Sequence, residues 1–236
     1  MKKVLCFLLF YSLFISTTCL AEVMPFLTED EIPTVNFLPL PPESFEAEFS
    51  SDLQKYEWGK TVRNTPRGEQ AKEDAAITLE YFSKIFSKPF DMVISKENTP
   101  EISALLERLL WTTYSCIGKS KSNMMRIRPF VQFNEPTPLP EEEERLKENS
   151  SYPSGHTMAG WAAALVLAEI NPLNQNEILS RGFEYGQSRV IVGFHYQSDV
   201  DHARLIASVL VNRLHANADF LEQMQKAKAE FKAKQN

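Results

Sequence analysis

Apolar residues at helical spacing are the feature that most constrains the fold of this chain. In the stretch 102–110 they recur at i, i+3, i+4, i+7 and i+8, which is one face of an α-helix. The residues concerned are Ile102, Leu105, Leu106, Leu109 and Leu110. Thr99-Pro100 precedes them, and Pro is favoured at the first position of a helix. The pattern therefore predicts a helix that starts at residue 100.

Similar spacing predicts further helices over 69–87, 157–171, 175–189, 198–215 and 218–233. The acidic run 140–148 reads as a solvated helix start behind Pro140. No alternation of apolar and polar residues is long enough for a half-buried strand, and the cluster Val190-Ile191-Val192 is too short for one. We therefore expect a single, mostly α-helical domain.

The N-terminal part of the chain differs in composition from the rest. Residues 1–21 combine Lys2 and Lys3, an apolar run and a small residue at Ala21, which is the pattern of a cleaved signal peptide. An uncleaved anchor or a lipid on Cys19 are the alternatives. Residues 22–45 are rich in Pro and predict an extended segment, and residues 46–236 would form the helical domain. The expected location is the periplasm.

Charge and cysteine content exclude some classes of protein. Without Lys2 and Lys3 the chain has 23 basic and 31 acidic residues, a net charge of −8, which argues against a nucleic-acid partner. An anionic substrate remains possible, because a local cluster of cations can oppose the overall field. After the leader no apolar run reaches about 18 residues, so no membrane span is expected. Cys116 then has no disulfide partner and is predicted to be a buried structural thiol.

Three short segments hold an unusual set of polar residues. The first has Lys121 and Arg128-Pro129, the second is Pro153-Ser154-Gly155-His156, and the third has Ser188-Arg189, His195 and Asp199. Arginine forks and a lysine charge suit the oxygens of a phosphate group. Ser154 offers a hydroxyl, and Gly155 lets an anion approach the backbone at a helix start, where free N–H groups favour negative charge. The set predicts a site for a tetrahedral oxyanion.

The histidines would supply the reaction. Asp199, expected in the first turn of a helix capped by Ser198, would fix the tautomer of His195 and leave its other nitrogen as a nucleophile. His156 would protonate the leaving oxygen and later activate water. Each residue alone is more often a surface charge or part of a loop, so the prediction depends on their joint arrangement.

The order and spacing of these segments resemble the signature of the type 2 phosphatidic acid phosphatase superfamily, which includes the vanadium-dependent haloperoxidases. The stretches RNTPRGEQAKEDA, MRIRPF, YPSGHT and GQSRVIVGFHYQSDVD are similar to those of the bacterial class A nonspecific acid phosphatases. The resemblance implies an all-α helical bundle, no cofactor, no metal, small phosphate monoesters as substrates and a homo-oligomer. It also implies a phosphohistidine at His195, orientation by Asp199, acid–base catalysis by His156, and phosphate binding by Lys121, Arg128, Ser154, Gly155 and Arg189.

Two positions depart from the family pattern, and other functions stay open. Tyr196 stands where Trp is common, and His202 where a small residue is usual. These differences affect the expected substrate preference and stability, not the expected reaction. The alternatives are a lipid phosphatase or a vanadate-dependent haloperoxidase that uses the same residues, or a periplasmic phosphoester-binding protein without activity.

Overall fold

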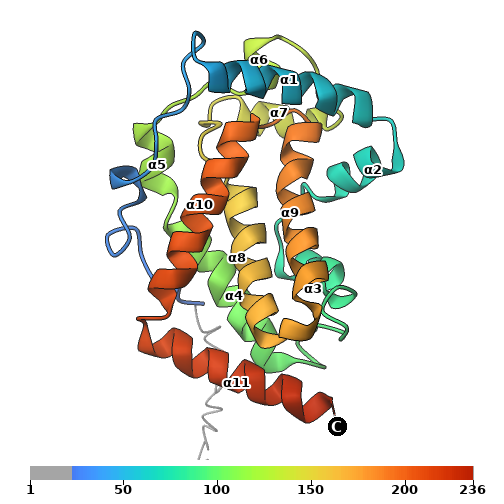
Figure 1. Ribbon diagram of the computed structural model, residues 1–236, viewed down its shortest axis with the longest axis vertical. Coiled ribbons are helices and arrows are strands. Elements are labelled where there is room, and N and C mark those ends of the chain that lie inside the picture. Colours follow the sequence, from blue (N-terminus) through green and yellow to red (C-terminus); the bar gives the residue numbers. More distant parts are fainter. Residues whose placement is uncertain (1–22, 236) are drawn as a thin grey trace, which may run out of the picture.

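The computed structural model describes residues 23–235, and within this range all regular elements are helices (Figure 1). The α-helices are α1 (Ala47–Val62), α2 (Pro66–Glu73), α3 (Leu79–Ser87), α4 (Pro100–Ser115), α5 (Gly118–Asn123), α6 (Pro129–Gln132), α7 (Pro140–Leu146), α8 (Gly155–Ile170), α9 (Gln175–Ile191), α10 (Gln197–Leu214) and α11 (Ala218–Lys234). Two short 3-10 helices, η1 (Thr34–Asn36) and η2 (Pro172–Asn174), complete the set. The predicted all-α, single-domain fold is confirmed. The predicted signal peptide lies outside the described residues.

Helix α8 forms the centre of the bundle and packs against α4, α9 and α10. Most of its residues are buried, including a run of small ones at Ala162, Ala163 and Ala164. Small residues also let α9 approach closely: a Cβ added to Gly182 would lie 2.4 Å from the Cβ of Ala164. A Cβ on Gly160 would lie 2.3 Å from Cδ1 of Tyr185. The α8–α9 interface therefore has no room for larger side chains at these two positions.

The segment before α1 lies on the helical body. The amide of Phe26 donates to Oγ1 of Thr112 in α4 at 2.8 Å, and both Phe26 and Leu27 are buried in the core. The Cys116 thiol is buried as well and contacts the carbonyl of Leu27 at 3.6 Å. Burial raises the pKa of Cys116 to about 12. The prediction of a structural thiol is therefore confirmed.

The single helix predicted over 69–87 is wrong, because the chain breaks between α2 and α3. Asp74 is fully buried there and accepts from the hydroxyls of Tyr81 at 2.7 Å and Ser188 at 2.6 Å. It also forms an ion pair with Arg181 of α9. Oγ1 of Thr78 then accepts from the Tyr81 amide at 3.1 Å and caps α3. These tertiary contacts and the new cap outweigh the continuous helical spacing.

The order of the helices brings three helix ends together. Helices α8 and α10 begin at the end of the bundle where Figure 1 shows α1, α6 and α7, and α9 ends there, while α11 crosses the opposite end. The three segments singled out in the sequence therefore meet at this end. None of the helices described in residues 23–235 combines the length and apolar character that crossing a membrane requires.

Candidate active site

The Pro-Ser-Gly-His turn opens α8 as predicted. The Ser154 side chain caps the helix, accepting from the amide of Thr157 at 3.3 Å and from its hydroxyl at 2.9 Å. The Ser154 amide donates to the carbonyl of Asp199 at 3.1 Å, which ties this turn to the start of α10. A Cβ added to Gly155 would lie 3.9 Å from Cε of Lys121, so the lysine stem runs beside the first turn. The arrangement places a cation next to the electropositive end of a 16-residue helix.

Lys121 and Arg128 meet at one carbonyl group. Nζ of Lys121 donates to the carbonyl of Ser150 at 2.9 Å, and Nη2 of Arg128 donates to the same oxygen at 3.1 Å. Nε of Arg128 donates to the carbonyl of Leu146 at 2.9 Å, at the end of α7. Arg128 is 3% exposed, so this scaffold of carbonyl groups fixes its guanidinium in a buried position.

The position of Arg128 defines the tautomer of His195. Its Nη1 atom lies 3.2 Å from Nε2 of His195 and also donates to the carbonyl of Phe194 at 3.0 Å. A guanidinium only donates hydrogen bonds, so Nε2 must carry the lone pair and Nδ1 the proton. Nδ1 lies 3.4 Å from Oδ2 of Asp199. The ring is therefore held with the lone pair of Nε2 towards the arginine.

Burial and neighbouring charges set the protonation states of this pair. Burial, followed by the charge of Arg128, lowers the pKa of His195 to about 3. His195 is thus neutral throughout the mildly acidic range, as a nucleophile must be. Burial alone would raise the pKa of Asp199, but hydrogen bonding to His195 and the charge of Arg126 hold it well below its usual value. Asp199 remains a carboxylate.

Arg189 has buried donors that are available to an anion. It is 1% exposed, yet its Nε and Nη1 atoms are buried without a hydrogen-bond partner among the described residues. Its guanidinium lies 5.0 Å from the ring centroid of Phe194, and its carbonyl accepts from the amides of Phe194 and His195 at 3.1 and 3.3 Å. A buried arginine with unsatisfied donors costs folding free energy unless an anion accepts from them.

His156 lies on the other side of this group of cations. Its Nε2 lies 2.9 Å from the carbonyl of Ala75, so Nε2 is the donor and Nδ1 carries the lone pair of the neutral ring. The ring stacks on Tyr185 at a centroid distance of 6.3 Å. Burial and the charge of Arg189 hold the pKa of His156 well below 6.5. An anion bound among these cations would reverse the second effect and favour the imidazolium.

The structure thus brings together all eight residues predicted for the site: Lys121, Arg128, Ser154, Gly155, His156, Arg189, His195 and Asp199. One local prediction was wrong, because the N-cap of α10 is Tyr196 and not Ser198. The amide of Tyr196 donates to Oδ2 of Asp199 at 2.8 Å, which still places that carboxylate in the first turn.

Sequence reasoning missed Arg126, Asp52 and Ser151. Arg126 bridges the carboxylates of Asp52 and Asp199, and the Ser151 hydroxyl donates to Oδ2 of Asp199 at 2.5 Å. The only signal in the sequence was the alternation of Arg126 and Arg128 with the apolar residues around them. Asp52 carried none, since a single acidic residue in a polar helix is ordinarily exposed.

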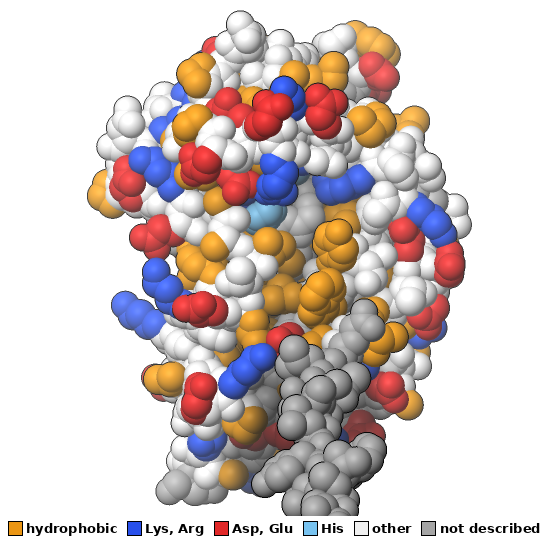
Figure 2. Space-filling view, turned by 180° about the vertical axis from the view of Figure 1, so that it is seen from behind, with side chains coloured by type: hydrophobic (Ala, Val, Ile, Leu, Met, Phe, Trp, Pro, Cys, Tyr) orange, Lys and Arg blue, Asp and Glu red, His pale blue; other side chains and the backbone are white. Residues whose placement is uncertain are grey.

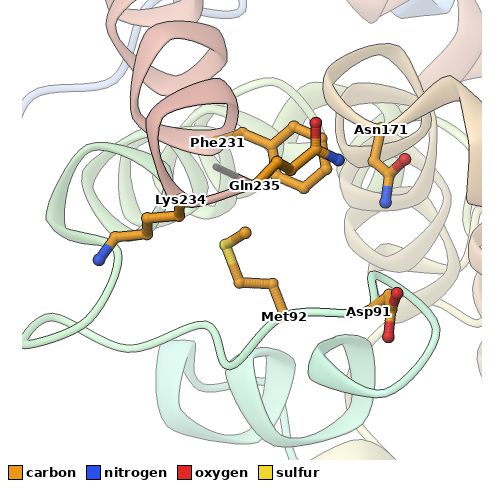
Figure 3. A pocket seen from close by; sticks show the side chains of 6 residues that line it. All are labelled: Asp91, Met92, Asn171, Phe231, Lys234 and Gln235. Carbon is orange, nitrogen blue, oxygen red and sulfur yellow. The ribbon is translucent and has the colours of Figure 1, made fainter.

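Charged side chains surround a hollow on one face of the molecule. Figure 2 shows a histidine side chain recessed in a hollow, with Lys or Arg side chains beside it and a row of acidic side chains above it. A separate cavity of about 440 Å³ lies near the end of α11 and is lined by Asp91, Met92, Asn171, Phe231, Lys234 and Gln235 (Figure 3). That cavity has no histidine in its lining. Across residues 23–235 no three His, Cys, Asp or Glu side chains are grouped to hold a metal ion.

A bundle with two histidines, a carboxylate and three cations at converging helix ends defines a class of phosphoryl-transfer proteins, and the comparisons place the chain within it. Residues 105–220 match the model of the PAP2 superfamily. A non-specific acid phosphatase of Providencia stuartii is 47% identical over 201 residues, covering 85% of this chain and 81% of the relative. Its counterpart in Salmonella typhimurium is 39% identical over 93% of this chain and 88% of the relative. An acid phosphatase of Zymomonas mobilis is 35% identical over 83% of this chain and 74% of the relative. The chain belongs to the class A acid phosphatases of the PAP2 superfamily.

Proposed function

We propose that this protein is a phosphoric monoester hydrolase that works through a phosphohistidine at Nε2 of His195. The observation that carries the proposal is that buried Arg128 contacts the neutral imidazole of His195, while the charge of buried Arg189 acts on both Arg128 and His156. Arg189 has unsatisfied donors, and Arg128 touches the nucleophilic nitrogen. A phosphate group that accepts from both arginines would bring its phosphorus in front of Nε2.

The reaction has two steps. Nε2 of His195 attacks phosphorus while the bond from phosphorus to the ester oxygen breaks. Protonated His156 gives its Nδ1 proton to that leaving oxygen, and Asp199 stabilises the positive charge that develops on His195. In the second step neutral His156 takes a proton from water, whose oxygen attacks phosphorus. The N–P bond breaks, and phosphate leaves.

The cations would stabilise both transition states. Arg128 and Arg189 face the three equatorial oxygens, and Lys121 and the first amides of α8 add further positive charge. These groups would bind the phosphoryl part of the ester and not its alcohol part. This supports a broad range of phosphate monoesters as substrates. Vanadate, which adopts the five-coordinate geometry of the transition state, should inhibit the enzyme.

The proposal includes export and location. Residues 1–21 have the pattern of a signal peptide, and the periplasm is the proposed compartment. Mass spectrometry of the protein recovered from the periplasmic fraction would reveal the cleavage, with Glu22 expected as the first residue. A mature protein that still carries residues 1–21 would contradict this part. Assembly into a homo-oligomer, the remaining expectation, is tested by light scattering of the same sample.

Trapping of the intermediate tests the mechanism. Rapid acid-free quenching of a reaction with a ³²P-labelled phosphoester should leave label on a peptide that contains His195, and His195→Ala should abolish both label and turnover. Retained turnover in that variant would refute nucleophilic catalysis by His195. Halide oxidation by the vanadate-loaded protein with peroxide would favour the haloperoxidase alternative. Tight phosphate binding without any turnover would favour a binding protein.

A further inference from the structure

Next to His195 and Asp199, called the catalytic pair below, lies a buried charge network that the proposed mechanism has not used. Nη1 of Arg126 donates to Oδ1 of Asp199 at 2.5 Å, and its Nη2 donates to Oδ2 of Asp52 at 2.6 Å. Asp52 is 1% exposed and Asp199 fully buried, so two carboxylates share one guanidinium away from water. Such a network has defined geometry because each charge depends on its partners.

Asp52 links the network to a distant helix. It belongs to α1, and its Oδ1 accepts from the amide of Ser198 at 2.8 Å, while Oδ2 accepts from the Ser198 hydroxyl at 2.6 Å. The same hydroxyl accepts from Nη1 of Arg126 at 2.7 Å. A carboxylate from α1 thus satisfies a free amide in the first turn of α10, next to Asp199 in sequence.

The network also shares a chain segment with the phosphate-binding group. Residues 125–128 lie outside the helices, and exposed and buried side chains alternate along them. Arg126 and Arg128 are buried, whereas Met125 and Ile127 are 65% and 62% exposed. Arg126 and Arg128 are two residues apart in this segment. Arg126 contacts Asp199, and Arg128 contacts His195. The same short segment therefore contacts both His195 and Asp199.

We propose that Arg126, anchored by Asp52, is a positioning residue for phosphoryl transfer that fixes the carboxylate of Asp199 and limits its electrostatic effect on His195. This inference rests on the proposed role of His195. With Oδ1 of Asp199 held by Arg126, Oδ2 remains for the Ser151 hydroxyl, the Tyr196 amide and Nδ1 of His195. The positive charge of Arg126 offsets part of the negative charge that would otherwise stabilise the imidazolium.

The sign of the effect follows from the charges that face the pair. His195 is faced by Arg128, by Lys121 of α5 and by Asp199, and its charge in turn affects His156 of α8. Asp199 is faced by Arg126, His195 and Lys121. Without Arg126, an ionised Asp199 would raise the pKa of His195. A protonated Asp199 would no longer orient the ring. Both changes would lower the activity first at the acidic end of the pH profile.

The first experiment compares Arg126→Met with the wild type in phosphomonoester hydrolysis across the acidic range. We expect kcat to fall about 10- to 100-fold and the KM to stay within about threefold, because Arg126 supports a reacting group without touching the anion. The acidic limb of the pH profile should move up by on the order of one unit. Arg126→Lys should restore the charge but not the bridge to both carboxylates, and its profile should be intermediate.

Two further variants keep the test independent of folding. Asp52→Asn retains the side-chain volume but removes the anchor of Arg126, and it should lower kcat by less than Arg126→Met does, without moving the acidic limb up. Arg204→Met removes another mostly buried arginine, which pairs with Asp201 at 2.7 Å on the same helix as Asp199, and should keep the wild-type profile. Activities are referred to the fraction of enzyme that binds vanadate, so that unfolded protein does not count.

A double-mutant cycle with Asp199→Asn decides between positioning and a merely structural role. If Arg126 acts through Asp199, adding Arg126→Met to Asp199→Asn should lower kcat by less than about twofold further. A full additional loss, or an unmoved acidic limb in Arg126→Met, would overturn the inference. Failure of the proposed function would look different, because His195→Ala would then retain turnover.

Discussion

Nη1 of Arg128 lies 3.2 Å from Nε2 of His195, so the cation that would bind phosphate occupies the line of approach to the nucleophile. The arginine therefore has two functions at one atom. Without ligand its Nη1–H group donates to the lone pair of Nε2, and its charge helps to keep the imidazole neutral. With a phosphate in place, the same N–H group would donate to a phosphoryl oxygen directly in front of that lone pair.

The first prediction concerns this contact. Arg128→Lys should lower kcat/KM about 10²- to 10³-fold, because an ammonium group cannot reach the carbonyl groups and Nε2 at once. Steady-state hydrolysis of p-nitrophenyl phosphate measures the effect, with Arg204→Lys as the matched control for loss of a guanidinium. Near wild-type activity in Arg128→Lys would show that only the charge matters at this position.

The second prediction concerns pH and Lys121. Burial and the charge of Arg128 lower the pKa of Lys121 to about 7, so its ammonium group is present below this value and lost above it. Anion affinity of the free enzyme should therefore weaken as the pH rises through 7. The inhibition constant of sulfate, whose own charge is constant in this range, reports the change. Lys121→Arg stays charged and should extend tight binding to higher pH. The exposed Lys147→Arg should leave the curve unchanged, and an identical curve for Lys121→Arg would contradict the assignment.

The third prediction separates stability from activity at Arg189. Arg189→Met should lower kcat/KM by about 10³-fold but leave the melting temperature unchanged or higher, because it removes buried donors without partners. Sulfate at 100 times its dissociation constant should stabilise the wild type by about 2.7 kcal/mol. It should not stabilise the variant. Arg181→Met on the same helix breaks a satisfied ion pair with Asp74 and should cost about 3–5 kcal/mol. Thermal unfolding of the wild type and Arg189→Met, each with and without sulfate, and of Arg181→Met provides the comparison. A large loss of stability in Arg189→Met would argue against an anion site.

The fourth prediction tests the packing of α8 on α9. Gly182→Ala adds a methyl group 2.4 Å from Cβ of Ala164 and should destabilise the fold by about 1–3 kcal/mol, which lowers the melting temperature by roughly 2–12 °C. Gly118→Ala is the control, since the nearest atom to its added Cβ is a Glu29 carboxylate oxygen at 3.4 Å. Equal melting temperatures for the two variants would mean that the helices separate without cost.

Local patterns were sufficient to predict most helices and to single out eight residues that the structure brings together. Most of the stripe from Ile102 to Leu110 became the buried face of α4. The start of a helix after the Pro-Ser-Gly-His turn and the position of Asp199 in a first turn also follow from short-range rules. The break at Asp74 did not follow from them, because the carboxylate is stabilised by Arg181 and Ser188, more than a hundred residues away in sequence. Asp52 was missed for the same reason, because its partners lie far away in sequence, in α10 and next to α6.

The contact between Asp52 and the start of α10 has a consequence for synthesis. The carboxylate that supports the catalytic pair is made early, while His195 and Asp199 emerge only after α9 is complete. A nascent chain that ends with α9 contains Arg126, which pairs with Asp52, but it lacks His195, Asp199 and the Ser198 contact to Asp52. Enzymatic turnover would thus begin only when the first and the penultimate helices have docked, which makes an activity assay a direct readout of completed folding.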